Sequence, residues 1–270
     1  MRRSLIMTRL SIVIVSYNAR EDLERCLESL AVNPPSVEHE VVVVDNASRD
    51  DTVHAVRTRW PAVRLIEAGG NLGFARANNM GIRQSSGELL LLLNGDTIVP
   101  AGAIDALVAA IDRRPDVAVA GPRLVDGAGR AELSFGVMLS PLGEIRQKLR
   151  ARGNVERLTS REREVDWVSG ACLLVRRSDA EAVGLLDERF FMYTEDVDFC
   201  SAIRARGRGV LFSPASRVIH LRGRSRATAP RETARAYRRS QIAFYEKHHP
   251  TWVPLLRLYL RIRGRGPDTS

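Results

Sequence analysis

The chain has 270 residues, 44% of them hydrophobic, which is enough to bury a full core and excludes a disordered protein. Its formal net charge is +9, and the excess of arginine and lysine lies beyond residue 200, which favours an anionic partner. No stretch approaches the roughly 20 apolar residues of a membrane-spanning helix, and the basic N-terminus lacks the apolar core of a signal peptide. Three cysteines without metal-like spacing indicate a reducing, cytoplasmic compartment and no zinc site.

From residue 10 to about residue 125, short apolar runs alternate with segments of helical periodicity. Strands are predicted at 12–15, 41–44, 63–66, 89–93 and 117–120, with helices between them. Such a β-α-β succession predicts a parallel, doubly wound sheet covered by helices. The first two predicted strands end on polar residues, Ser16-Tyr17-Asn18 and Asp45.

The run of five leucines at 89–93 has no polar face, which is typical of a central strand buried on both sides. It ends on Asn94, Gly95 and Asp96. Ligands of open α/β sheets gather at the carboxyl ends of the strands, so this tip is a candidate site. A simple turn is the alternative, since Asn-Gly also favours hairpins.

The second half of the chain is less regular. Residues 127–164 are predicted to form a long excursion over one edge of the sheet. After it we expect strands at 165–168 and 171–175, a short helix with a capping box of Ser178 and Glu181, and two short strands at 210–212 and 218–220. Glu195 and Asp196 open a further helix, where the helix dipole alone favours acids, and His220 ends the last strand.

Six motifs in order carry a family resemblance over roughly residues 10–225. They are Ser-Ile-Val-Ile-Val-Ser-Tyr-Asn18, Val-Val-Asp45-Asn-Ala-Ser, Asn71-Leu-Gly-Phe-Ala-Arg-Ala-Asn78-Asn79, Leu-Leu-Asn94-Gly-Asp96, Thr194-Glu-Asp196-Val-Asp198 and His220-Leu-Arg-Gly223-Arg-Ser225. Together they resemble the family 2 glycosyltransferases, and within that family the bacterial rhamnosyltransferase-like subgroup. The common metal motif of the family has aspartate at both ends, whereas Asn94 stands at the first position here, as is usual in the subgroup.

The resemblance implies a GT-A fold in the α/β class, with a doubly wound, mostly parallel sheet. We expect a catalytic domain over residues 8–225, divided into a nucleotide-sugar-binding half at 8–125 and a smaller mixed acceptor-side half at 126–225. A basic helical extension would follow at 226–270. The implied activity is inverting, metal-dependent transfer of a sugar from a nucleotide diphosphate donor.

The resemblance also assigns roles to residues of this sequence. The donor-binding residues would be Ser16, Tyr17, Asn18, Asp45, Asn71, Gly73, Arg76 and Asn94. An aspartate such as Asp45 is suited to accept the imide hydrogen of uracil or thymine. Asp96 would bind Mg²⁺ or Mn²⁺, with His220 completing the set of ligands. Asp196 would be the general base, and Glu195 would orient it or bind the acceptor.

The subgroup resemblance favours dTDP-rhamnose as donor, with a UDP-sugar as the alternative, and a glycan or polyprenyl-diphosphate-linked glycan acceptor used in cell-envelope polysaccharide synthesis. The tail at 235–263 interleaves arginines with aromatic residues and leucines. This composition predicts either peripheral attachment to the inner face of the cytoplasmic membrane or a helix packed on the catalytic domain.

Two other classes of function are alternatives to a glycosyltransferase. A nicotinamide-dependent oxidoreductase is suggested by the glycines at 69–73, but the dinucleotide fingerprint belongs after the first strand, and Ser16–Arg20 holds no glycine. A nucleic-acid-binding module is suggested by the net charge alone, and basic tails also bind anionic lipid, so we expect no nucleic-acid partner.

Overall fold

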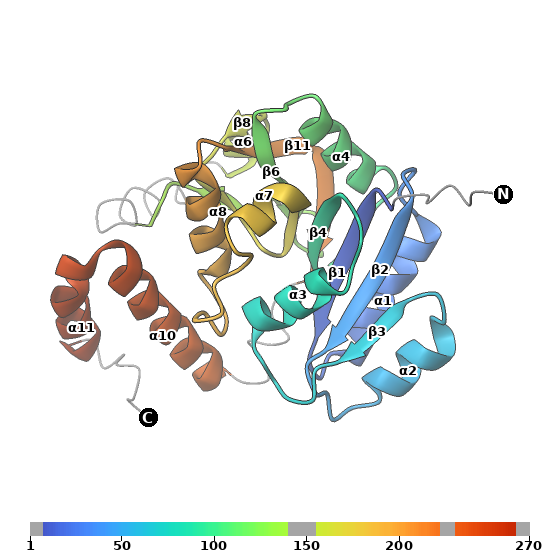
Figure 1. Cartoon of the computed structure of the whole chain (residues 1–270), viewed down its shortest axis with the longest axis horizontal. Coiled ribbons are helices and arrows are strands. Elements are labelled where there is room, and N and C mark those ends of the chain that lie inside the picture. The colour runs from blue at the N-terminus through green and yellow to red at the C-terminus, as the bar shows by residue number, and fades with distance from the viewer. Residues whose placement is uncertain (1–7, 140–154, 222–229, 263–270) are drawn as a thin grey trace.

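The protein was analysed as a computed structural model that describes residues 8–139, 155–221 and 230–262 (Figure 1). The strands are β1 (Leu10–Ser16), β2 (His39–Asp45), β3 (Arg64–Glu67), β4 (Leu89–Asn94), β5 (Thr97–Ile98), β6 (Val117–Val125), β7 (Phe135–Gly136), β8 (Arg163–Glu164), β9 (Trp167–Val168), β10 (Cys172–Arg176) and β11 (Gly209–His220). The helices are α1 (Arg20–Val32), α2 (Thr52–Arg59), α3 (Phe74–Arg83), α4 (Ala103–Asp112), α6 (Val155–Leu158), α7 (Arg177–Ala182), α8 (Glu195–Ala205), α10 (Pro230–His248), a 3₁₀ turn (Pro250–Trp252) and α11 (Val253–Ile262).

The main sheet has the strand order β3-β2-β1-β4-β10-β6-β11-β5, with β8 paired to β11. The first four strands are parallel, as the β-α-β succession predicts. Strand β10 then runs antiparallel between β4 and β6, and β6 and β11 are again parallel. One continuous sheet therefore contains a parallel part, β3-β2-β1-β4, and a mixed part, β10-β6-β11-β5.

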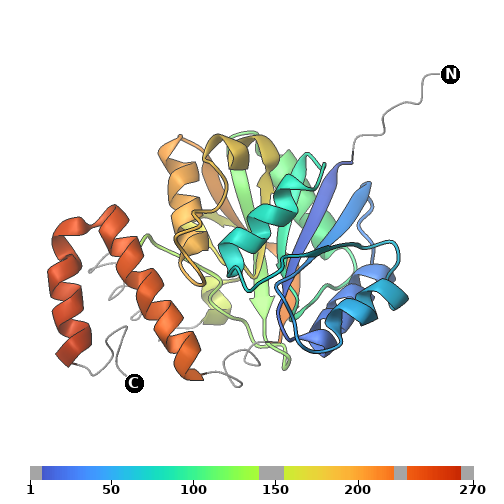
Figure 2. The same cartoon turned by 60° about the horizontal axis from the view of Figure 1, so that its bottom comes forward.

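Helices cover both faces of this sheet (Figure 2). On one face, the apolar sides of α1 and α4 pack against the odd-numbered leucines of β4 and the even-numbered residues of β1. On the other face, α3, α7 and α8 pack against Leu90 and Leu92. All five leucines of β4 are 1% exposed or less, so the absence of a polar face matches the burial of both sides of the strand.

Two details of the second half differ from expectation. The strands expected at 210–212 and 218–220 are one continuous strand, β11, whose pairing with β6 shifts register between Ser213 and Arg217. This bulge interrupts the apolar pattern of the sequence, which is why the pattern predicts two short strands in place of one long strand. The capping box is also wrong, because Ser178 lies inside α7, whose N-cap is Arg176 and has no side-chain cap bond.

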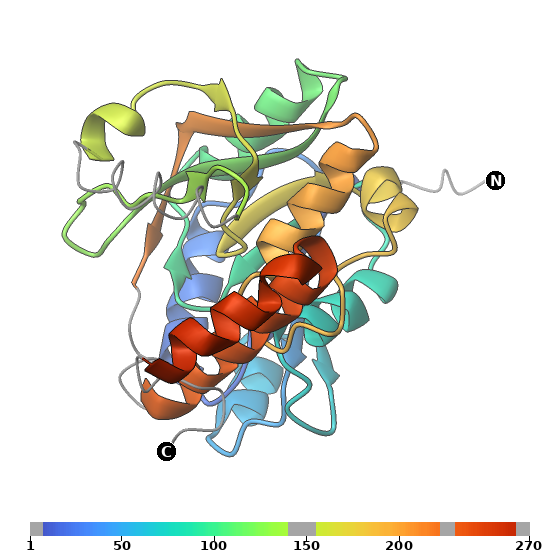
Figure 3. The ribbon, with the colours of Figure 1, turned by 90° about the vertical axis from the view of Figure 1, so that its left-hand side faces the viewer.

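The C-terminal helices α10 and α11 form a hairpin against one side of the domain (Figure 3). Phe244 and Tyr245 of α10 form a buried cluster with Phe190 and with Val197 of α8. Among the residues that the structure describes, no helix is long and apolar enough to cross a membrane.

The contact of α3 with β1 gives a testable expectation for stability. A Cβ added at Gly81 would lie 2.5 Å from Cγ1 of Val13, although alanine is otherwise favoured over glycine inside a helix. We expect Gly81→Ala to lower the free energy of unfolding by about 1–3 kcal/mol through overpacking. Urea denaturation measures this, with Gly70→Ala as the control, since a Cβ at Gly70 would meet nothing within 4 Å. Equal midpoints for the two variants would contradict the expectation.

Candidate active site

The polar strand ends predicted from the sequence meet at one edge of the sheet. Ser16 lies opposite Asp45 in the pairing of β1 with β2, and Val15 lies opposite Asn94 in the pairing of β1 with β4. Beyond the turn that follows β4, His220 pairs with Thr97 of β5. Parallel pairing and this return strand bring together residues that lie more than 200 positions apart in the chain.

The tips of β1 and β2 present buried oxygen atoms without protein partners. Ser16 and Asp45 are each 2% exposed, yet neither Ser16 Oγ nor Asp45 Oδ1 has a hydrogen-bond partner among the described residues. The other oxygen of Asp45 accepts a hydrogen bond from the Ser48 amide at 3.0 Å. An unsatisfied buried acceptor costs about 1–3 kcal/mol, so such a pair is suited to a ligand that supplies the missing donors.

Two neighbouring residues predicted for the same site have different positions. Tyr17 is 45% exposed and is one of the few large aromatic residues left open to solvent in the described chain. Asn18 has a positive φ of 49° and its Oδ1 accepts a hydrogen bond from the Arg49 amide at 2.7 Å. Asn18 therefore joins the loop after β1 to the loop after β2.

Asn46 is a residue that the site prediction left out, although it stands in the Asp-Asn-Ala-Ser motif. It is buried, and its Nδ2 donates to Asn71 Oδ1 at 3.0 Å and to the Gly73 carbonyl at 3.3 Å. Its Oδ1 accepts from the Leu72 amide at 2.8 Å. Asn46 thus fixes the glycine-containing loop at 69–73 against the end of β2.

Gly73 is required at its position for two reasons. Its φ of +80° is unfavourable for other residues, and an added Cβ would lie 2.3 Å from the Phe191 carbonyl oxygen. The amide of the next residue, Phe74, donates to that same carbonyl at 2.6 Å. The loop before α3 is therefore in direct contact with the segment that leads to the acid pair.

Asp96 and His220 face each other at the end of β4. His220 Nε2 lies 3.2 Å from Asp96 Oδ1, and His220 Nδ1 lies 3.6 Å from Oε2 of Glu132. The Asp96 side chain is 25% exposed and the His220 side chain 10%, so the carboxylate is the more accessible of the two groups. No group of three or more His, Cys, Asp or Glu suited to a metal occurs in the described parts of the chain. Asp96 and His220 are the two side chains here that could hold a hard cation, which would take its other ligands from water and phosphate.

The acid pair occupies two different environments at the start of α8. Asp196 Oδ2 accepts a hydrogen bond from the Gly170 amide at 2.9 Å, and its Oδ1 accepts from the Val197 amide at 2.8 Å. Glu195 is 6% exposed and its Oε2 has no partner among the described residues. Burial, with the nearby charge of Asp196 adding to it, raises the pKa of Glu195 well above its ordinary value. Burial also raises the pKa of Asp196.

Helix α10 holds the segment that precedes the acid pair. Tyr193 and Thr194 both have positive φ, an unfavourable backbone conformation that needs support from its surroundings. Ser240 of α10 supplies it, because its Oγ donates to the Met192 carbonyl at 2.7 Å and its own carbonyl accepts from Thr194 Oγ1 at 3.3 Å. No sequence pattern indicates this contact, since the two segments lie 46 or more residues apart.

A second anchor lies one helical turn further on. Asp198, 2% exposed, accepts hydrogen bonds from Lys247 Nζ at 2.8 Å and lies 2.6 Å from His248 Nε2. Lys247 also contacts Asp187 at 2.8 Å. Asp198 thus fastens α10 to α8 and belongs to this docking contact, although it stands in the same motif as Asp196.

Arg76 is a predicted site residue whose contact in the described structure is with Glu188 and not with another predicted site residue. Its side chain is 60% exposed and its Nε lies 3.7 Å from Oε2 of Glu188, on the outer side of α3. Its role toward the donor remains a prediction.

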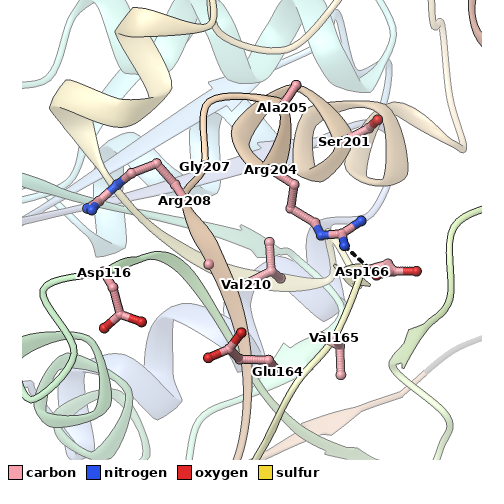
Figure 4. A pocket seen from close by; sticks show the side chains of 11 residues that line it. Asp116, Glu164, Val165, Asp166, Ser201, Arg204, Ala205, Gly207, Arg208 and Val210 are labelled. Carbon is pink, nitrogen blue, oxygen red and sulfur yellow. Dashed lines mark ion pairs between the residues drawn. The ribbon is translucent and has the colours of Figure 1, made fainter.

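A hollow of about 630 Å³ lies elsewhere, at the amino ends of β6 and β11 (Figure 4). Its lining includes Asp116, Glu164, Asp166, Arg204 and Arg208. Arg204 pairs with Asp166 at 2.9 Å, and Arg208 pairs with Asp179 at 3.0 Å. These charges are matched within the protein, and the hollow contains none of the predicted site residues.

The family model described as "Glycosyl transferase family 2" matches residues 11–184. The chain belongs to this family. The match covers more than half of the chain and spans the tips of β1, β2 and β4. The protein is therefore a glycosyltransferase, as the six motifs predicted.

Comparison with individual proteins extends this assignment. The glycosyltransferase is 35% identical to "N-acetylglucosaminyl-diphospho-decaprenol L-rhamnosyltransferase" of Mycobacterium tuberculosis, over 90% of this chain and 86% of that protein. It is 31% identical to a low-salt glycan biosynthesis hexosyltransferase of Haloferax volcanii, over 72% of this chain and 61% of that protein. The first of these similarities supports the resemblance to rhamnosyltransferases.

Solved structures confirm the GT-A fold. A mannosyltransferase from Pyrobaculum calidifontis, solved in complex with GDP-Man and Mn²⁺, superposes with a TM-score of 0.64 at 20% identity. The alignment covers 93% of this glycosyltransferase and 69% of that chain. The expected α/β class and sheet arrangement are thereby confirmed.

The burial of Glu195 predicts a pH-dependent stability. Because its pKa is higher in the folded protein than the ordinary value of 4.5, the folded state binds this proton more tightly than the unfolded state. The stabilisation is complete at pH below the ordinary value and is lost as the pH rises through the folded-state pKa. The Glu195→Gln variant cannot lose this proton, so we expect it to gain stability relative to wild type between about pH 5 and about pH 8. Urea unfolding at both pH values tests this, and parallel pH profiles would contradict it.

Proposed function

We propose that this glycosyltransferase transfers L-rhamnose from dTDP-rhamnose to a hydroxyl group of a polyprenyl-diphosphate-linked N-acetylglucosamine. The observation that carries the proposal is the 35% identity, over 90% of the chain, to a protein named for this reaction. The site supports it through oxygen acceptors at the tips of β1 and β2, a carboxylate and imidazole at the end of β4, and an acid pair at the start of α8. The catalytic domain would comprise residues 8–225, and the reaction would take place at the cytoplasmic face of the membrane.

The nucleoside would bind at the tips of β1 and β2. A thymine or uracil ring carries an imide N–H, and ribose and deoxyribose carry hydroxyl groups, all of which can donate to Ser16 Oγ and Asp45 Oδ1. These are the buried oxygen atoms that lack protein partners. Tyr17 offers an exposed ring for stacking, and Asn18, Asn71 and Gly73 would line the path toward the diphosphate.

Asp96 and His220 would hold a divalent cation, with Asn94 next to them facing the donor. When bound, Mg²⁺ or Mn²⁺ neutralises the negative charge that develops on the leaving diphosphate. The nitrogen ligand favours Mn²⁺ slightly over Mg²⁺. Glu132, 3.6 Å from the other ring nitrogen of His220, would orient the imidazole.

Asp196 would be the general base. The amides of Gly170 and Val197 fix the orientation of its carboxylate, while each oxygen keeps a free lone pair. An acceptor hydroxyl that transfers its proton to Asp196 attacks the anomeric carbon from the side opposite the diphosphate. The new C–O bond forms as the bond from carbon to phosphate oxygen breaks, so the configuration inverts. Glu195, which is buried behind it, would orient Asp196 or contribute to acceptor binding.

The metal assignment predicts a coupling between cation and nucleotide. We expect wild-type protein to bind dTDP more tightly with Mn²⁺ than with EDTA, because a cation held by Asp96 would offset the negative charge of the diphosphate. Asp96→Ala should remove this difference and cation-dependent activity while leaving thermal unfolding unchanged, and Asn94→Asp should preserve metal affinity. Titration calorimetry with dTDP and with UDP measures the effect. Equal affinities of wild-type protein with Mn²⁺ and with EDTA would show that the metal assignment is wrong.

The base assignment predicts different kinetics for the two acids. Asp196→Asn should lower kcat by about 10²–10⁴-fold while donor binding and stability are kept, since a positioned base typically contributes this much. Glu195→Gln should act mainly through the KM of the acceptor. Steady-state kinetics with dTDP-rhamnose and a polyprenyl-diphosphate N-acetylglucosamine, with the product identified by mass spectrometry, test both. Near-normal turnover of Asp196→Asn together with loss of turnover in Glu195→Gln would reverse the roles.

A further inference from the structure

Helix α11 and the turn before it carry an exposed apolar face. Large apolar side chains with exposures from 46% to 75% follow one another at spacings of three and four residues, which places them on one side of a helix. They are Trp252, Leu255, Leu258, Tyr259 and Ile262. In the described chain only four other large apolar residues are comparably exposed, and three of those lie singly on other elements. We call these five residues the α11 outer face.

The side of α11 opposite the outer face packs against α10, so the outer face points away from the rest of the protein. Leu260 is buried, and Val253 and Leu256 pack against the cluster formed by Phe244 and Tyr245 of α10 with residues of the catalytic portion. An ion pair of Arg257 with Glu246 at 2.7 Å joins the two helices. In Figures 1 and 3, α10 lies between α11 and the domain, and α11 is the outermost element.

The anchoring of α10 makes this orientation stable. Lys247 and His248 contact the buried Asp198, and Ser240 contacts the segment before the acid pair. The two helices of the tail therefore differ: α10 packs on the domain, whereas the large apolar side chains of the α11 outer face are 46–75% exposed.

The charge of the hairpin formed by α10 and α11 indicates which kind of partner the α11 outer face binds. Residues 230–262 contain seven arginine and lysine residues against two glutamates. Arg235, Arg239, Arg257 and Arg261 are exposed. Two copies meeting through α11 would bring these like charges together, which opposes self-association. An anionic bilayer surface attracts them, and it also accepts apolar side chains below the headgroups, with Trp and Tyr at the interface.

We propose that the α11 outer face lies on the surface of an anionic lipid bilayer and attaches the glycosyltransferase to it peripherally. The hairpin contacts α8, whose first residues are the acid pair, so the bilayer would lie on the acceptor side of the active site. This orientation suits a lipid-linked acceptor if the proposed function holds, but the attachment itself does not depend on catalysis.

Vesicle flotation of the full-length protein tests the proposal. The vesicles are of phosphatidylcholine alone, or of phosphatidylcholine in which about a third of the lipid is replaced by phosphatidylglycerol. At low salt we expect wild-type protein to float with the anionic vesicles and much less with the neutral ones. Leu258→Glu and Ile262→Glu should each weaken binding to anionic vesicles by about tenfold or more, because a carboxylate opposes both burial and the surface charge.

A matched control separates the effect of the α11 outer face from the effect of a change in net charge. Val32→Glu introduces the same charge at a residue that is 71% exposed on α1, and it should float like wild type. Unchanged thermal unfolding and unchanged dTDP affinity of Leu258→Glu would show that the fold and the active site are intact. If Leu258→Glu floats as well as wild type, or if wild type binds neutral and anionic vesicles equally, the proposal is wrong. If wild type does not float but sediments as a dimer that Leu258→Glu dissociates, the outer face joins two copies instead.

Discussion

The burial of both faces of β4 is the constraint on which the rest of this structure depends. Five consecutive leucines leave no side for solvent, so the strand must lie in the middle of the sheet with helices above and below. Its position between β1 and β10 joins the parallel half to the mixed half. The first residues that can leave the core are Asn94 and Asp96, and they emerge at the junction of the two halves.

The active-site edge is assembled by polar contacts between loops, most of which involve main-chain atoms. Asn46 ties the loop at 69–73 to the end of β2, and the Phe191 carbonyl accepts a hydrogen bond from the first residue of α3. The Gly170 amide then orients Asp196. The loop after β2, the loop before α3 and the segment before α8 are therefore held to one another by hydrogen bonds.

The C-terminal hairpin stabilises the segment before α8 and the first turn of that helix. Through Ser240 it supports the backbone of Tyr193 and Thr194, whose positive φ would otherwise be unfavourable. Through Lys247, which pairs with Asp198, and His248, which lies 2.6 Å from it, α10 supplies the polar partners that a buried acid needs. The same helix therefore stabilises the start of α8 and, in our proposal, sets the position of the bilayer relative to Asp196.

The sequence by itself determined the α/β class, the alternation of strands and helices to residue 125, and the polar tips at Ser16, Asp45 and Asp96. These depend on local periodicity and on where an apolar run stops, both of which are readable along the chain. The six motifs determined the family.

Only the tertiary structure decided that β11 is one bulged strand, that Asn46 fixes the loop at 69–73, that Asp198 belongs to the docking of α10, and that the two helices of the tail differ in their surroundings. Each of these depends on contacts between residues far apart in sequence. Whether an aspartate is buried or a leucine is exposed depends on the residues that pack against it. Those residues lie far away in the sequence, so local sequence patterns do not predict it.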